Sequence, residues 1–383
     1  MAEPARAAPG PPARRGRLIA VLLVLFFLVS ISTVVRFYTD LLWYREVGLD
    51  SVFWTILGSK VLLGVVFGLG FFVFTLANLL IVTRIMPAYR RPVDPDDPIE
   101  RYRGAVFPYL RWAAIGISAL LGLLFSVSVT PNWERIVLAL NQVPFDRSDP
   151  VFGRDLSFFV FRLPFYEFLY GWLFSGLIVV ILLVAAAHYL TGGIRPQTPG
   201  DRVTPQVKAH LSALIGLGVL LRAWGYRLDQ FRLLFSERGE VTGASYTDVH
   251  AEMPALTLLI VISVIVAALF LVNIRRRGWA LPLAGAGLWL VIAILAKGLF
   301  PFIIERFTVI PAQLEKEGPF IERNIESTSV AYDLDEIEVR EHPAIEGVSR
   351  EAIAGNPDTI QNIRLWDTDT LTQAYRQLQE IRT

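Results

Sequence analysis

Seven apolar stretches divide the first three hundred residues of the chain, with shorter polar segments between them. A bilayer core about 30 Å thick is crossed by roughly 20 apolar residues of helix. Because backbone polar groups find no water in hydrocarbon, such stretches must be helical. They cover residues 18–35, 61–82, 112–129, 168–190, 210–224, 255–272 and 279–296. The pattern predicts an all-α membrane protein with seven transmembrane helices, of which the fifth is the least apolar.

The first stretch could also be read as a signal peptide, because the basic leader 1–17 precedes it. Its apolar core exceeds the usual length of roughly 7 to 15 residues, and no A-x-A cleavage site follows. An uncleaved first helix is therefore the favoured interpretation.

Basic loops alternate along the chain. Arginines are concentrated in the leader, in the loop 83–111 and in the short loop 273–278, whereas the intervening loops mix both signs. Lys and Arg favour the cytoplasmic side of a membrane. With seven crossings, this predicts a multi-pass plasma-membrane protein with a cytoplasmic leader (1–17), a transmembrane domain (18–303) and an extracytoplasmic C-terminal region (304–383).

The three loops predicted to lie outside interleave Phe, Tyr and Trp with charged residues, over 36–54, 132–168 and 226–253. Aromatic residues of this kind suit the headgroup level of a bilayer. We expect the loops to form an aromatic-rich outer cap. Within the second loop, "SFFVFRLPF" is typical of a short strand or extended segment that ends at Pro164.

The C-terminal region differs in charge from the rest. Residues 1–303 contain 28 Lys and Arg against 19 Asp and Glu, whereas residues 304–383 contain 8 against 16. "FIERNIEST" predicts a helix, and the alternating apolar residues after it predict a strand. "DTDTLTQAYRQLQEIRT" predicts an amphipathic helix with Asp367 or Thr368 as its N-cap. We expect the start of an acidic α+β domain, which belongs to a longer protein because the sequence stops inside this helix.

Four motifs carry a family resemblance: "DPVFGRDLSFFVFRLPFYE", "GEVTGASYTDVHAEMPAL", "PFIERNIESTSVAYDL" and "NPDTIQNIRLWDTDTLTQAYRQLQEIRT". With these motifs the chain resembles an uncharacterised family of large integral membrane proteins from actinobacteria and cyanobacteria, over essentially its whole length. The resemblance implies seven N-terminal spans before a long extracytoplasmic region. It implies no activity and no catalytic residue.

Composition excludes several kinds of chemistry. Hydrophobic residues make up 54% of the chain, and there is no cysteine for a disulfide, a thiolate nucleophile or a Cys-based metal site. The four histidines are scattered, and no Walker loop, dinucleotide fingerprint or G-x-S-x-G elbow occurs. We therefore assign no catalytic residue, cofactor or metal ligand, and we expect no nucleic-acid partner. Enzymatic activity is left open, without a motif to support it.

Charged residues near the ends of spans are the main functional candidates. Arg222 and Lys297 lie near the predicted outer surface, where long basic side chains ordinarily reach the interface. The alternative is an anion or lipid-headgroup site. Its candidate residues are Arg222, Lys297, Arg135, Arg154 and Arg162. No predicted span has a carboxylate at its centre, which disfavours an ion-coupled transporter.

Gly64 and Gly68 form a G-x-x-x-G pattern in the second stretch. Close packing between helices of one chain is its usual role, and homodimerisation is the alternative.

Three functions are consistent with these features. The favoured one is a non-enzymatic envelope protein, whose helices anchor an extracytoplasmic domain that binds envelope proteins, lipids or wall components. The alternative is a transporter or lipid-handling protein with a polar cavity lined by Arg222 or Lys297. A membrane-embedded enzyme would need clustered carboxylates, for instance Asp146, Asp149, Asp155 and Glu167 with Asp248. The expected partners are the lipid bilayer and envelope proteins or further copies of the chain.

Overall fold

The computed structural model describes residues 13–86, 109–195, 202–239, 241–341 and 347–379, without the side chains of 13–26 and 28–30. These ranges contain no β-strand, only two isolated bridges between single residues. The chain divides into two compact units, Met1–Asn324 and Ile325–Thr383. Most of the predicted cytoplasmic leader and of the arginine-rich loop 83–111 lies outside the described residues.

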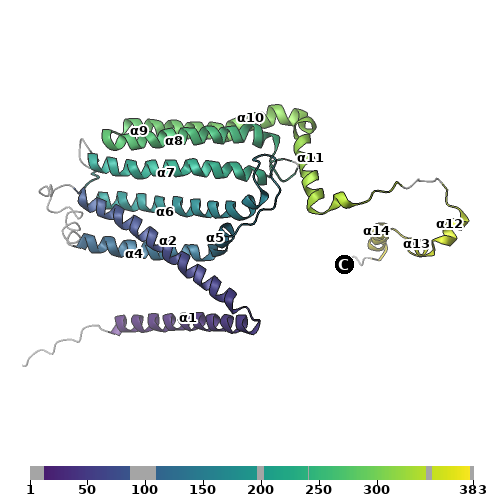
Figure 1. The fold of residues 1–383 in the computed structure, drawn as a ribbon, viewed down its shortest axis with the longest axis horizontal. Coiled ribbons are helices and arrows are strands. Elements are labelled where there is room, and N and C mark those ends of the chain that lie inside the picture. Colours follow the sequence, from purple (N-terminus) through teal and green to yellow (C-terminus); the bar gives the residue numbers. More distant parts are fainter. Residues whose placement is uncertain (1–12, 87–108, 196–201, 240, 342–346, 380–383) are drawn as a thin grey trace, which may run out of the picture. The chain divides into compact units, whose positions relative to one another are not determined.

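The first unit is a bundle of long helices. Figure 1 shows four of them side by side, namely α6 (Leu163–Leu190), α7 (Pro205–Arg232), α8 (Met253–Arg276) and α9 (Ala280–Ile294). The oblique helix α2 (Asp50–Arg84) packs against α4 (Leu110–Val129) and α6. A turn joins α1 (Ala13–Glu46) to α2, and the rings of Phe37 and Tyr44 contact Phe53 there. The short helix α5 (Trp133–Leu140) follows α4.

Six helical segments of the described chain are long and apolar enough to cross a membrane. They are Asp50–Arg84, Leu110–Leu140, Phe158–Leu190, Pro205–Phe235, Asp248–Arg276 and Ala280–Ala331. They coincide with the second to seventh predicted stretches, which confirms these stretches as helices able to span. The first stretch lies within α1, most of whose apolar side chains are not described, so a seventh span stays a prediction.

The weakly apolar fifth stretch belongs to a helix that is longer than expected. α7 continues past residue 224 to Arg232, and it packs between α6 and α8. Its buried polar groups have partners on α8: Gln230 Nε2 donates to Thr257 Oγ1 (2.7 Å), and Asn273 Nδ2 donates to Ser212 Oγ (2.8 Å). Because protein rather than lipid surrounds much of α7, it tolerates polar residues that lower its hydropathy.

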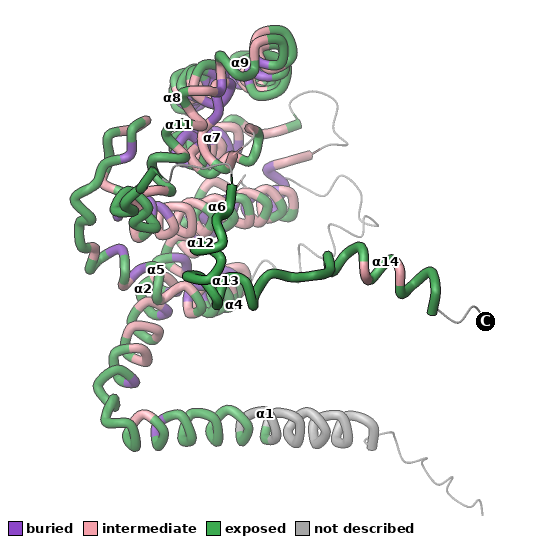
Figure 2. The backbone as a smooth tube through the Cα atoms, turned by 90° about the vertical axis from the view of Figure 1, so that its right-hand side faces the viewer, coloured by how far each residue is buried: buried purple, intermediate pink, exposed green. Residues whose placement is uncertain are grey.

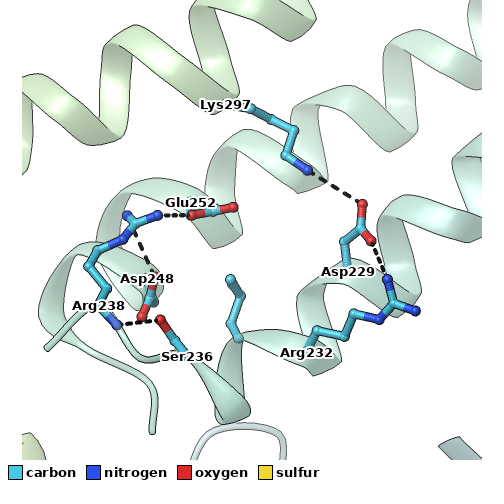
Figure 3. A pocket seen from close by; sticks show the side chains of 8 residues that line it. Asp229, Arg232, Ser236, Arg238, Asp248, Glu252 and Lys297 are labelled. Carbon is cyan, nitrogen blue, oxygen red and sulfur yellow. Dashed lines mark hydrogen bonds and ion pairs between the residues drawn. The ribbon is translucent and has the colours of Figure 1, made fainter. Parts of the chain in front are cut away.

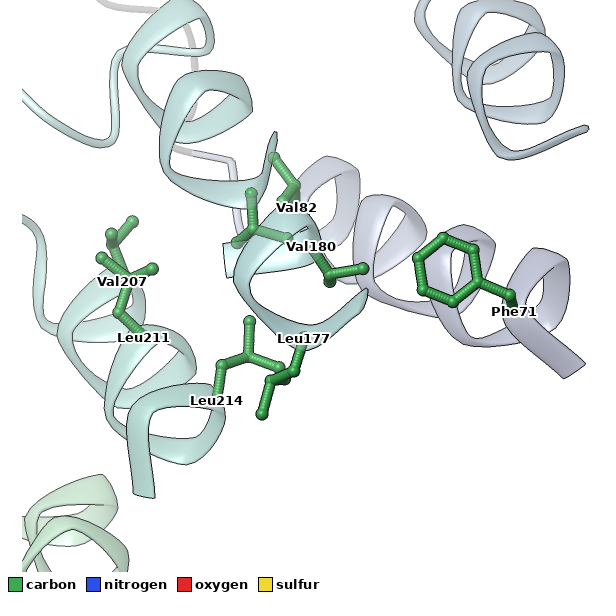
Figure 4. Packing of buried hydrophobic residues seen from close by; sticks show 8 residues of the cluster. Phe71, Val82, Leu177, Val180, Val207, Leu211 and Leu214 are labelled. Atoms are coloured by element: carbon green, nitrogen blue, oxygen red, sulfur yellow. The ribbon is translucent and has the colours of Figure 1, made fainter. Parts of the chain in front are cut away.

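The largest apolar core lies where α2, α6 and α7 meet. Figure 4 shows labelled valine and leucine side chains of α6 and α7 directed toward one another, with Phe71 of α2 at the edge of the same cluster. Phe71 also stacks on Phe125 of α4, with 3.8 Å between ring centroids. Figure 2 shows that buried residues face neighbouring helices whereas outward faces are exposed. Exposed apolar faces of this kind suit contact with lipid.

Two glycines bring α2 and α4 into backbone contact. A Cβ on Gly68 would lie 2.7 Å from Ser126 Cβ, and one on Gly122 would lie 2.9 Å from the Gly68 carbonyl oxygen. The G-x-x-x-G pattern of Gly64 and Gly68 thus serves packing within the chain. The same face is not free for a second copy.

In the described part of the chain, four π-turns each precede a proline-containing helical turn. η3 (Phe158–Arg162) precedes Leu163-Pro164, and η5 (Asp248–Glu252) precedes Met253-Pro254. η6 (Leu295–Leu299) precedes α10 (Phe300–Ile304), which contains Pro301, and η7 (Glu305–Val309) precedes Ile310-Pro311. In each turn, the N–H before the proline bonds to the carbonyl five residues back. Proline has no N–H and collides with the carbonyl four residues back, so the wider turn accommodates it. The prediction of an extended segment at "SFFVFRLPF" is therefore wrong.

The strand predicted in the C-terminal region is not present either. α11 (Gln313–Ala331) is followed by the 3₁₀ turn Leu334–Glu336, and residues 337–341 have no regular structure. Alternating apolar residues form a stable strand only beside a second strand, and the described residues supply none. The α+β expectation is thus not met in this part of the chain.

The predicted amphipathic helix is confirmed as α14 (Thr368–Gln379), after the short helices α12 (Arg350–Gly355) and α13 (Pro357–Gln361). Asp367 caps it, because its Oδ1 accepts from the amides of Asp369 (2.9 Å) and Thr370 (3.0 Å).

A carboxylate also organises the loop between α5 and η3. Asp155 accepts hydrogen bonds from the amides of Ser157 (2.8 Å) and Phe145 (3.1 Å). Hydrogen bonding from the Ser157 side chain and the Phe145 amide lowers the pKa of Asp155 from 3.8 to about 2. The loop is thus built around an ionised side chain.

We expect Asp155→Asn to lower the melting temperature at neutral pH, because asparagine carries no charge to strengthen these bonds. A folded-state pKa below the unfolded value gives stability that is complete above pH ~4 and lost as the pH falls to ~2. The melting-temperature difference between wild type and variant should shrink over that window. A difference that stays constant down to pH ~2 would contradict this role.

Candidate functional site

A charged pocket lies where α7 ends, α8 begins and η6 follows α9. Its cavity volume is about 240 Å³. The lining residues are Asp229, Arg232, Leu233, Ser236, Arg238, Asp248, Glu252 and Lys297. Figure 3 shows Lys297, Asp229 and Arg232 on one side of the pocket, and Arg238, Asp248 and Glu252 on the other.

Asp229 is the centre of the first group. Its Oδ2 lies 2.9 Å from Arg222 Nη2 and 3.5 Å from Lys297 Nζ, and its Oδ1 lies 3.6 Å from Arg232 Nη1. Arg232 Nε also donates to Glu167 of α6 (2.6 Å). Three cations therefore share two carboxylates, and this positive group has a surplus charge of about +1.

Helical spacing produces this arrangement. Arg222 and Asp229 are seven residues apart, which places them on the same face of α7 two turns apart. The Arg222 guanidinium lies over the Tyr226 ring (4.0 Å) between them and donates to the Tyr170 hydroxyl (3.1 Å). The absence of a side chain at Gly225 provides the space for this guanidinium, because a Cβ there would lie 2.6 Å from Arg222 Nη1.

Asp248 and Glu252 form the second group around Arg238. Arg238 Nη2 donates to Glu252 (2.6 Å), and its Nη1 lies 3.6 Å from Asp248 Oδ1. Asp248 is fully buried, and its Oδ2 accepts from the Ser245 hydroxyl (2.8 Å) and amide (3.0 Å). Its Oδ1 has no hydrogen-bond partner. This negative group has two carboxylates for one cation.

The structure brings two of the five predicted basic residues together, since Arg222 and Lys297 share Asp229. Arg154 lies instead over the rings of Phe158 (4.5 Å) and Phe231 (5.2 Å). Arg135 and Arg162 are exposed and do not line the pocket. Binding of an anion or headgroup stays a prediction.

The carboxylates considered for an enzyme do not gather in one cleft. Asp149 accepts from the amides of Val151 and Phe152, and Asp155 from that of Phe145. Both therefore hold the backbone of their own loop. In the described residues, no group of three or more His, Asp or Glu side chains could hold a metal ion.

Sequence reasoning missed Asp229 and the pairing of Arg238 with Glu252. The predicted fifth stretch ends at residue 224, whereas α7 ends at Arg232, so Asp229 lay outside the predicted helix. The seven-residue spacing from Arg222 to Asp229 was the available signal.

A second polar group lies at the opposite end of the bundle. His188 Nε2 lies 3.1 Å from His210 Nδ1, and His210 Nε2 lies 3.0 Å from Asn78 Oδ1. Asn78 Nδ2 donates to the Phe74 carbonyl, so the Asn78 Oδ1 atom is the one that faces the His210 imidazole. His210 Nε2 must then carry the hydrogen, and His210 Nδ1 accepts from His188. Two histidines that seemed unrelated in sequence thus meet because α6 and α7 are antiparallel neighbours; His342 lies outside the described residues.

We expect Asn78→Ala to destabilise the chain by about 1–3 kcal/mol, because the buried His210 N–H loses its acceptor. Asn141→Ala is the matched control, since Asn141 also donates to the carbonyl four residues back (2.8 Å) but is exposed. Chemical unfolding in detergent micelles measures both variants. Equal effects would show that the bond to His210 contributes nothing.

Apolar helices packed side by side, with charged groups at one end and a histidine pair at the other, define a bundle compatible with a multi-pass membrane protein. Residues 17–383 match the model of the uncharacterised protein family UPF0182. The chain belongs to this family, which confirms the resemblance to an uncharacterised protein family; the seven spans and the extracytoplasmic region that the resemblance implied stay predictions.

Several relatives from bacteria show how much of the family sequence is present. A UPF0182 protein of Frankia casuarinae is 40% identical over 366 residues, which cover 95% of this chain and 36% of that protein. One from Streptomyces coelicolor is 37% identical over 381 residues (97% and 38%), and one from Desulforamulus reducens is 36% identical over 361 residues (90% and 39%). The chain spans little more than a third of the length of these relatives. No solved structure matches it.

Proposed function

We propose that this chain anchors and positions an extracytoplasmic region that binds envelope proteins, lipids or wall components. The observation that carries the proposal is the exposure of the described residues of the second unit. No described residue between 325 and 379 is buried, and Leu365, Trp366 and Leu378 are 92%, 70% and 83% exposed. Large apolar side chains of this kind are typical of surfaces that meet a partner.

The absence of cysteine allows a direct test of orientation. Gln373→Cys on α14 should react with a membrane-impermeant maleimide in intact cells, whereas Arg276→Cys at the end of α8 should react only after permeabilisation. Both positions are exposed in the structure. Labelling with the opposite preference would refute the proposed anchor.

Partner binding is tested by photocrosslinking in native membranes. A photoreactive residue at Leu378, on the apolar face of α14, should crosslink an envelope component. The same residue at Gln373, on the opposite face, should not. Equal crosslinking at the two positions would remove the argument from the exposed apolar face.

The charged pocket favours a second candidate function, a transporter or lipid-handling protein. That alternative requires a polar cavity lined by Arg222 or Lys297, and Lys297 lines the pocket while Arg222 shares its counter-ion. Proteoliposomes with acyl-labelled fluorescent phospholipids test it. Movement of label between leaflets should depend on Asp229, and no movement above that in protein-free liposomes would exclude a role in flipping lipids.

A further inference from the structure

The pocket separates charge into a positive side and a negative side. The positive group of Asp229 has one cation in excess, and the negative group of Arg238 has one carboxylate in excess. We infer that the pocket binds a small zwitterion, with a primary ammonium against Asp248 and Glu252 and an anionic group against Lys297 and Arg232. The inference rests on the same pocket as the lipid-handling function and is independent of the anchoring role.

The negative side has the geometry for an ammonium. Asp248 lines the pocket and is fully buried, and its Oδ1 accepts no hydrogen bond, with Arg238 Nη1 3.6 Å away. A buried carboxylate oxygen without a hydrogen bond costs free energy even beside a cation at this distance, and an ammonium supplies three N–H donors to lower that cost. Figure 3 shows one oxygen of Glu252 facing Arg238 and the other directed toward the middle of the pocket.

The positive side retains donors for an anion. Lys297 Nζ and Arg232 Nη1 approach Asp229 only to 3.5 and 3.6 Å, whereas Arg222 makes the close contact of 2.9 Å. The side chains of Lys297 and Arg232 are 37% and 54% exposed. Both can therefore turn toward a phosphate or carboxylate oxygen while Arg222 continues to neutralise Asp229.

The size and surroundings of the pocket restrict the ligand. A cavity of about 240 Å³ is below the range usual for drug-sized molecules and fits a headgroup or an amino acid. Apolar residues of the same helical segment as Lys297 are exposed, including Leu295, Leu299 and Phe302. The zwitterion is thus available from a phosphatidylethanolamine headgroup in the membrane or from a free amino acid.

Native mass spectrometry of the full chain in detergent tests the inference. Dioleoyl phosphatidylethanolamine, phosphatidylglycerol and phosphatidylcholine are added separately at equal concentration. We expect phosphatidylethanolamine to be retained best, because it alone combines a primary ammonium with a phosphate. Glycine and phosphoethanolamine are added as competitors; displacement by either supports the site, and binding of glycine without retained lipid assigns the ligand to a free amino acid.

Variants locate the binding. Asp248→Asn, Glu252→Gln and Lys297→Met should each weaken binding of phosphatidylethanolamine by about tenfold, the effect of losing one charge-assisted hydrogen bond. Arg36→Gln and Glu237→Gln, at exposed positions outside the pocket, should bind as the wild type does. If Asp248→Asn does not fold, Glu252→Gln decides, since Glu252 is less buried.

Three results would overturn the inference. Preference for phosphatidylglycerol would mean a plain anion site, and equal retention of phosphatidylcholine would mean that ammonium N–H groups are not recognised. No binding of any lipid or competitor would leave the pocket without a ligand of this class. Binding without movement of lipid between leaflets would support the site while rejecting the transport function.

Discussion

Asparagine in place of Asp229 should destabilise the bundle by about 2 kcal/mol, less than the loss of one member of a fully buried ion group, because its partners Lys297 and Arg232 are 37% and 54% exposed. The carboxylate is the only one shared by Arg222 of α7 and Lys297 of η6 within the described residues. Without it, these cations repel one another across the α7–η6 contact. Unfolding in detergent micelles, followed by circular dichroism, measures the effect.

Glu237→Gln is the matched control for this prediction, because Glu237 is an exposed acid in the loop after α7. Adding Lys297→Met to Asp229→Asn should recover part of the lost stability, because one unpaired cation is removed. If Asp229→Asn unfolds like the control, the ion group contributes little to joining α7 and η6.

Leucine in place of Gly68 or Gly122 should separate α2 from α4 and cost about 3 kcal/mol, the upper part of the range for overpacking. At both positions the added carbon meets close neighbours that include backbone atoms, at 3.1 Å for the Gly122 carbonyl and 2.9 Å for the Gly68 carbonyl. Backbone atoms cannot move away as a flexible side chain does, so the helices must shift. Thermal unfolding in detergent micelles measures the loss.

Gly70→Leu and Gly116→Leu supply controls on the same two helices. A Cβ at either position meets nothing within 4 Å. These variants should be neutral or slightly stabilising, because glycine is a poor helix former. Equal losses at all four positions would show that the effect comes from leucine in the helix and not from the helix contact.

The sequence was sufficient to predict where helices occur but not where they end. The need to satisfy backbone groups in hydrocarbon makes a long apolar stretch helical whatever surrounds it. Polar residues next to a stretch carry no such constraint. The end of α7 was therefore placed too early, because the residues that extend it are satisfied by contacts with α8 and with Lys297, which are distant in sequence.

Local signals were reliable where their cause is local. The cap of α14 by Asp367 follows from side chain and backbone within three residues. The predictions of strands were wrong because a strand is stable only when it pairs with another strand, which a local pattern does not reveal. Dependence on distant partners also limited the prediction of the candidate site. Arg222 and Lys297 could be selected from the sequence as charges near helix ends. Asp229, Arg238 and Glu252 could not, because only the folded chain brings them to their ion-pair partners.

The π-turns have a consequence for how side chains are presented along the helices. An α-helix rotates by about 100° per residue, so one additional residue in a turn re-aims every side chain that follows. Lys297 lies inside one such turn and Glu305 begins the next. A helical wheel drawn through residues 280–331 therefore misplaces every residue after the first wide turn, and the lipid-facing side of this segment has to be assigned separately before and after each proline.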